Sequence, residues 1–96
     1  MFIIDLHYIK ALSEVEKFIP EHKQFLEKYY GNATFILSGR KEPRSGGVII
    51  ANCASREEVD ALICEDPFHR EAIARYTITE FLPSMTVDNL QHLKAM

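Results

Sequence analysis

The chain has 96 residues, of which 47% are hydrophobic and 26% charged, which is typical of one compact globular domain. Its formal net charge of −3 gives no basic field for nucleic acid, and no apolar run reaches the roughly 20 residues that span a bilayer. A folded chain this short buries only about 60% of its unfolded surface. We therefore expect a cytoplasmic homodimer that binds neither nucleic acid nor membrane.

The two cysteines, Cys53 and Cys64, form no CxxC pattern and predict neither a disulfide framework nor a zinc site. We expect both to be reduced and to serve packing. The sequence also contains no HExxH motif, glycine-rich phosphate loop, GxSxG elbow or nucleotide fingerprint. These observations give no support to a metalloprotease, an NTPase or a classical hydrolase, and we expect no metal and no cofactor.

The first third of the chain predicts a strand followed by a helix. Residues 2–9 alternate, and one face of this strand would carry Phe2, Ile4, Leu6 and Tyr8. Ser13 and Glu16 have the spacing of a capping box, which starts a helix at about residue 14. Pro20 then predicts either a kink or a second helix start, and the Gly-Asn pair at residues 31–32 predicts a left-handed stop.

The remainder predicts a hairpin, a second helix and a last strand. β-branched runs at residues 33–39 and 46–53 flank a loop with a proline and two glycines, which is typical of a hairpin. Ser55 and Glu58 form a second capping box, so a helix is expected from there to about residue 66. The alternating segment 73–82 predicts the final strand.

The element order is therefore βαββαβ, which predicts an α+β, ferredoxin-like fold with a four-stranded antiparallel sheet and both helices on one face. We expect one domain over residues 1–83 and a tail at 84–96, for which a short helix and a frayed end both fit the sequence. Ile3 and Phe81 would point away from the helices, on a sheet face that would be exposed to water. A second copy packed face to face is the simplest cover, and it makes the dimer part of the fold.

Two titratable residues fall on the inward stripes of the expected helices. His22 lies between Ile19 and Leu26 on the first stripe, and Asp66 extends the second. A carboxylate bonded to one ring nitrogen fixes the tautomer and leaves the other nitrogen as a base. Spacing alone nevertheless favours a core histidine satisfied by a backbone carbonyl. Asp66 before Pro67 equally has the pattern of a helix N-cap, and one carboxylate could serve both roles.

The end of the second strand offers groups that could bind a substrate oxygen. Ser38 has a hydroxyl and Gly39 an accessible backbone N–H, which suit a carbonyl or carboxylate. Arg40, Lys41 and Arg44 form a basic cluster that could attract an anionic ligand. Taken alone, these residues favour a simple turn and a solvated loop.

Three separated segments carry a family resemblance: PEHKQFLEKYY, LSGRKEPRSGGVIIANCASREE and EDPF. In this order and spacing, the chain resembles the YCII-related (YciI-like) family over about residues 1–83. The resemblance implies a ferredoxin-like domain that forms a dimeric α+β barrel. It also implies a histidine–aspartate dyad on His22 and Asp66, with the strand-end serine on Ser38. The family usually has a proline after the Ser-Gly pair, where this chain has Arg40.

We therefore predict a small dimeric enzyme in which His22 is a general acid or base and Asp66 orients it. Ser38, Gly39 and Arg40 would hold a small organic molecule that is anionic or carries a carbonyl group. Relatives resembling dehydrochlorinases or lyases, and a fold similar to muconolactone isomerases, imply elimination or isomerisation. The alternative is a non-catalytic module that binds a small ligand or a partner protein, with the His22–Asp66 bond purely structural.

Overall fold

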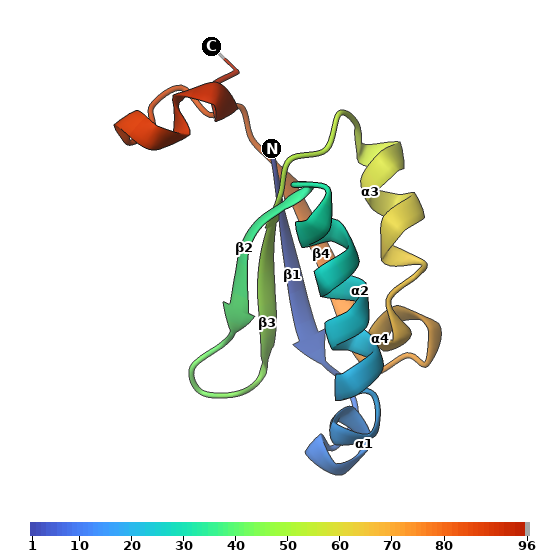
Figure 1. The fold of residues 1–96 in the computed structure, drawn as a ribbon. Coiled ribbons are helices and arrows are strands. Elements are labelled where there is room, and N and C mark those ends of the chain that lie inside the picture. Colours follow the sequence, from blue (N-terminus) through green and yellow to red (C-terminus); the bar gives the residue numbers. More distant parts are fainter. Residues whose placement is uncertain (96) are drawn as a thin grey trace.

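A computed structural model describes residues 1–95 as four strands, four α-helices and a final 3₁₀ helix (Figure 1). In chain order these are β1 (Phe2–Tyr8), α1 (Leu12–Lys17), α2 (Ile19–Gly31), β2 (Phe35–Arg40), β3 (Gly46–Ala51), α3 (Arg56–Ile63), α4 (Pro67–Arg70), β4 (Ala74–Glu80) and η1 (Asp88–Leu93).

The four strands form one sheet in the order β2-β3-β1-β4, and every neighbouring pair is antiparallel. β2 and β3 make the predicted hairpin, whereas the central strand β1 pairs with β3 and with β4. Helices α2, α3 and α4 lie on the same side of this sheet (Figure 1). The predicted α+β class and the ferredoxin-like strand order are therefore confirmed.

The core lies between the sheet and these helices. Alternation in β1 buries Phe2, Ile4 and Leu6 on the helix side, as the sequence predicts. Opposite them, α3 buries Val59 and Leu62, which lie one turn apart on its inward stripe. Burying one such side chain contributes about 1.5–3 kcal/mol, so this layer supplies most of the driving force that holds the helices on the sheet.

The first helical segment begins differently from the prediction. Ala11 is the N-cap of α1, and no side chain caps that end, so the expected capping box of Ser13 and Glu16 is wrong. The Glu16 carboxylate instead pairs with Arg44 of the hairpin loop, at 2.5 Å. Of the two outcomes predicted at Pro20, the second helix start is confirmed, because α1 ends at Lys17 and the proline lies in the first turn of α2.

The left-handed residue after α2 is Ala33, with φ of 63°, and not the predicted Gly31 or Asn32. The N–H of Ala33 bonds to the carbonyl of Tyr30, and the N–H of Thr34 bonds to that of Tyr29. These two bonds are the pattern of a Schellman motif, whose geometry fixes the left-handed position one residue beyond the cap. Tertiary placement of β2 therefore outweighs the small intrinsic cost of a left-handed alanine.

The second capping box is confirmed in its main contact. The Ser55 hydroxyl accepts from the N–H of Glu58 at 3.2 Å, while the Glu58 carboxylate accepts from the N–H of Ala54. The helix α3 ends at Ile63, earlier than the expected residue 66. Asp66 is therefore not in its last turn but begins the next helix, α4.

The two cysteines are free thiols in different surroundings. Cys53 is buried in the core, and burial, with a smaller effect from Glu58, raises its pKa to about 11. Cys64 is exposed and its thiol donates to the carbonyl of Asp60, so the expected packing role is wrong for this residue. Its helix position explains the error, because Cys64 follows the inward-facing Ile63 and points to solvent.

The tail leaves the sheet after β4 and contains the 3₁₀ helix η1, so of the two alternatives the short helix is the one formed (Figure 1). Met85 in this tail is 88% exposed. No helix in the described part of the chain is long and apolar enough to cross a membrane.

Candidate functional site

A cleft of about 320 Å³ lies between the start of α2, the end of β1 and the β2–β3 hairpin. Four predicted site residues line it together, namely His22, Ser38, Gly39 and Arg40. The fifth, Asp66, lies behind His22 and does not line the cleft. The remaining walls are largely apolar, with contributions from Leu6, Tyr8, Ile19, Leu26, Ile49 and Phe68. The structure thus brings residues from three distant segments of the sequence into one site.

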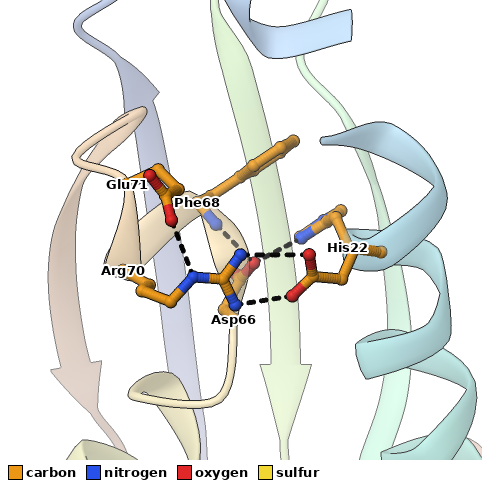
Figure 2. A network of polar contacts seen from close by, with 6 residues as sticks. His22, Asp66, Phe68, Arg70 and Glu71 are labelled. Atoms are coloured by element: carbon orange, nitrogen blue, oxygen red, sulfur yellow. Dashed lines mark hydrogen bonds and ion pairs between the residues drawn. The ribbon is translucent and has the colours of Figure 1, made fainter. Parts of the chain in front are cut away.

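His22 is held from two sides at the start of α2. Its ring stacks on Phe68 of α4, with centroids 4.1 Å apart and planes within 7° of parallel. Its Nδ1 lies 2.8 Å from Oδ1 of Asp66, and the pair is drawn in Figure 2. The side chain remains 15% exposed, which leaves one edge of the ring at the cleft.

Asp66 performs both of the roles that the sequence left open. It is the N-cap of α4, where Oδ1 accepts the N–H of Phe68 at 3.0 Å, and the same oxygen faces His22. Its residue exposure is 0%, so the carboxylate is fully removed from water. Pro67 at the first helical position explains why α4 begins there and carries Phe68 against the histidine.

The hydrogen bond to Asp66 decides which ring nitrogen of His22 is available. An ionised carboxylate only accepts, so Nδ1 carries the proton and donates it. Nε2 then has a free lone pair. It has no hydrogen-bond partner within residues 1–95 and is not a buried atom, so solvent in the cleft can reach it. This arrangement can take a proton from a molecule bound in the cleft.

Tyr76 of β4 is a third member of this group that the sequence reasoning missed. Its hydroxyl donates to Oδ2 of Asp66 at 2.5 Å. Burial, then the charge of Asp66 and the hydrogen bond to it, raise the pKa of Tyr76 far above its usual range, so the hydroxyl stays protonated. The alternation of β4 places Tyr76 on the core face with Ala74 and Ile78, which was the available signal.

A register shift in β2 brings Ser38 to the cleft. The shift lies between Phe35, which pairs with Ala51, and Leu37, which pairs with Ile50. One extra residue reverses the alternation, so Ser38 lies opposite the buried Ile49, whereas Leu37 turns to the other face.

Tyr30 is a second residue missed from the sequence. It lies in the last turn of α2, and its hydroxyl is 2.6 Å from the Ser38 Oγ. The hydroxyl of Tyr30 therefore fixes the position of the Ser38 hydroxyl at the cleft wall. When Tyr30 is the donor, the hydroxyl proton of Ser38 is free to bond a ligand.

The predicted basic cluster is divided by its ion pairs. Lys41 pairs with Asp5 at 2.7 Å, and Arg44 pairs with Glu16, which raises the pKa of Arg44. Arg40 makes no ion pair within the described residues and lines the cleft. Arg40 is therefore the cation with an uncommitted charge at this site.

Arg70 joins α4 to α2 beside the His22–Asp66 pair. Its guanidinium donates to both carboxylate oxygens of Glu21 in α2, at 2.6 and 3.0 Å, and through Nε to Glu71 at 2.8 Å (Figure 2). The hydrogen bond from Arg70 lowers the pKa of Glu21. Arg70 does not pair with Asp66, so the buried carboxylate depends on hydrogen bonds alone.

No group of three histidine, cysteine, aspartate or glutamate residues within residues 1–95 is arranged to hold a metal ion.

The fold and the cleft define a single-sheet, ferredoxin-like α+β protein with a paired histidine and aspartate. The sequence model of the YCII-related domain matches residues 1–82, and the chain belongs to that family. No curated protein matches the chain. A solved structure with the same fold is 5-chloro-2-hydroxyhydroquinone dehydrochlorinase from Burkholderia phenoliruptrix, in complex with 2,5-dihydroxybenzoquinone. It has a TM-score of 0.72 and 16% identity, and the match covers 86% of this chain and 95% of that one.

Proposed function

We propose that the protein is a small dimeric enzyme that catalyses an elimination or isomerisation on a small organic molecule, with His22 as general base and acid. The observation that carries this proposal is the bond between Nδ1 of His22 and a fully buried Asp66, at 2.8 Å, beside a cleft that Nε2 can serve. Asp66 orients the ring and stabilises the imidazolium that forms when Nε2 takes a proton.

The other predicted site residues hold the substrate. Ser38 donates a hydrogen bond to a carbonyl or hydroxyl oxygen, Gly39 lines the cleft beside it, and Arg40 balances a negative charge on the ligand. The apolar walls and a cleft of about 320 Å³ suit a molecule of the size of one substituted ring. The substrate class is therefore a small ring compound or oxo acid that carries or develops an anionic oxygen.

The reaction needs no covalent intermediate on the protein. Nε2 takes a proton from a C–H or O–H bond of the substrate, and the electron pair of that bond becomes part of a new double bond. In an elimination the leaving group departs with its own bonding pair, so the net loss is one proton and one anion. In an isomerisation the imidazolium returns the proton to another carbon.

The name of the structural neighbour suggests the first compound to test, 5-chloro-2-hydroxyhydroquinone, with chloride release as the assay. His22→Gln should lower turnover by about 10²–10⁴-fold, the usual contribution of a general base. His92→Gln is the matched control, since His92 is exposed in the tail, and it should retain wild-type turnover. Should the compound be inert, small hydroxylated rings and oxo acids form the next panel. Full turnover by a folded His22→Gln protein on any identified substrate would contradict the proposal.

The proposed dimer follows from the face of the sheet opposite the helices. Leu37 is 60% exposed there, and the neighbouring strands add the partly exposed Ile3, Val48 and Ile50. A second copy on this face would bury these side chains in an interface of about 1,600 Å², the usual size for a stable pair. The two free thiols suit a reducing compartment, which is why we place the protein in the cytoplasm.

The alternative proposal is a non-catalytic module, in which the same bond only joins two helices. The capping role of Asp66 and the stacking of His22 on Phe68 favour it. Thermal unfolding of His22→Gln separates the two cases. A structural role predicts a melting temperature several degrees lower, with ligand binding intact, whereas a site kept for chemistry tolerates the replacement.

A further inference from the structure

The buried carboxylate of Asp66 needs more than one hydrogen-bond partner. An isolated charge in a protein interior costs several kcal/mol unless its oxygens are satisfied. Oδ1 accepts from the N–H of Phe68 and from Nδ1 of His22, at 3.0 and 2.8 Å. Oδ2 accepts from the hydroxyl of Tyr76, which is its partner within the described residues. Both oxygens are therefore satisfied only while Tyr76 donates.

The geometry points to Tyr76 as the positioning residue of the dyad, which acts on His22 through Asp66 and not through the substrate. This inference rests on the proposed function, because positioning has a catalytic meaning only if His22 is the base. Tyr76 does not line the cleft. Its donor–acceptor distance of 2.5 Å is within the range of a hydrogen bond between a hydroxyl and a carboxylate anion.

The position of Tyr76 in the sheet makes it a rigid donor. It lies in β4 opposite Leu6 of β1, so its backbone is fixed by the central ladder. With Oδ2 held by this hydroxyl, the carboxyl group cannot rotate, and Oδ1 remains aimed at Nδ1. Without the hydroxyl, the group is free to turn. His22 then loses the acceptor that keeps its proton on Nδ1, and the tautomer with the proton on Nε2 becomes populated.

The experiment compares Tyr76→Phe with wild type by the ¹⁵N chemical shifts of the His22 ring, assigned with His22→Gln and recorded above pH 8. In wild type the neutral ring should carry its proton on Nδ1. In Tyr76→Phe the ratio of the Nδ1–H to the Nε2–H tautomer should fall about tenfold, the equivalent of one charged hydrogen bond. Tyr29→Phe is the matched control, because the hydroxyl of Tyr29 donates to the surface carboxylate of Glu65. Its His22 shifts should match wild type.

Two results would overturn the inference. One is a folded Tyr76→Phe protein whose His22 shifts are those of wild type. The other is measured on the wild-type protein, so it tests the inference even if Tyr76→Phe does not fold. It is the finding that the Tyr76 hydroxyl proton exchanges with water as fast as that of an exposed tyrosine. Neither measurement uses turnover, so failure of the positioning role is distinct from failure of the proposed enzyme, which the His22→Gln assay tests.

Discussion

Replacing Asp66 by asparagine and by alanine should separate the charge of this residue from its hydrogen bonds. Three donors converge on the carboxylate: the N–H of Phe68, the Nδ1–H of His22 and the hydroxyl of Tyr76. Asparagine retains an oxygen for the first two donors. Its NH₂ group meets Tyr76, whose hydroxyl can turn and accept. Alanine leaves all three donors without an acceptor.

The magnitudes follow from this count. In Asp66→Ala, the Phe68 N–H and the Tyr76 hydroxyl lose their acceptors away from water, while the partly exposed His22 can turn toward the cleft. At about 1–3 kcal/mol for each of these two buried donors, the variant should lose roughly 2–6 kcal/mol of unfolding free energy. In Asp66→Asn, weaker neutral bonds cost about 1 kcal/mol each, and this is offset because a charge is no longer buried. We expect a net change within about 1 kcal/mol.

The unfolding free energy and the melting temperature of both variants are measured by urea and thermal unfolding at fixed protein concentration, because the stability of the proposed dimer depends on concentration. For a chain of this size, 1 kcal/mol corresponds to about 4–8 °C, so Asp66→Ala should melt at least about 8 °C below wild type. Turnover should fall at least about 100-fold in both variants, since neither supports the imidazolium with a charge. If Asp66→Asn were as unstable as Asp66→Ala, the carboxylate would be a net stabilising structural element and the functional reasoning would fail.

Four further predictions concern the proposed dimer face, the cleft, the two cysteines and the packing of Gly46. Leu37→Asp should convert the dimer to monomer in sedimentation, because it places a charge in the proposed interface. Arg40→Gln should weaken binding of a small anionic ligand about tenfold in calorimetric titration, whereas unchanged affinity would exclude it from the site. Iodoacetamide at pH 8 should modify the exposed Cys64 well before Cys53, because the pKa of about 11 keeps the Cys53 thiol protonated at pH 8. Peptide mass spectrometry measures the two rates. Gly46→Ala should unfold the protein or cost several kcal/mol in denaturant titration, since its Cβ would lie 1.8 Å from the Leu6 carbonyl oxygen.

The order of the elements along the chain and the core faces could be predicted from the sequence because they depend on periodicity. The alternation of residues 2–9 places Phe2, Ile4 and Leu6 in the core whatever their neighbours are. The prediction of the first helix boundary was wrong because that boundary depends on a contact between distant residues and not on periodicity. Ser13 has a good local pattern, but Ala11 is the N-cap and Glu16 pairs with Arg44, a contact over 28 residues that no local rule contains.

The site was predicted in part. His22 was found because it lies where a helix stripe predicts an apolar residue. Asp66 was found by extending the stripe of a helix that ends earlier, at Ile63. Their contact, across 44 residues, depended on the family resemblance and not on spacing. Tyr76 was missed because a tyrosine on a core face has no polar signature of its own. Its role becomes visible only in the structure, where the hydroxyl is the one partner, within residues 1–95, of the second oxygen of Asp66.

The register shift in β2 links the cleft to the proposed dimer face. With regular alternation from Phe35, Leu37 would point into the core and Ser38 would point to the open face. The extra residue exchanges these two positions, so one local irregularity gives the cleft a hydroxyl and the outer face a large apolar side chain. An exposed leucine next to a site serine is costly for a monomer in water but favourable in a dimer. The same backbone feature that favours the proposed substrate binding therefore also favours the proposed pairing with a second copy.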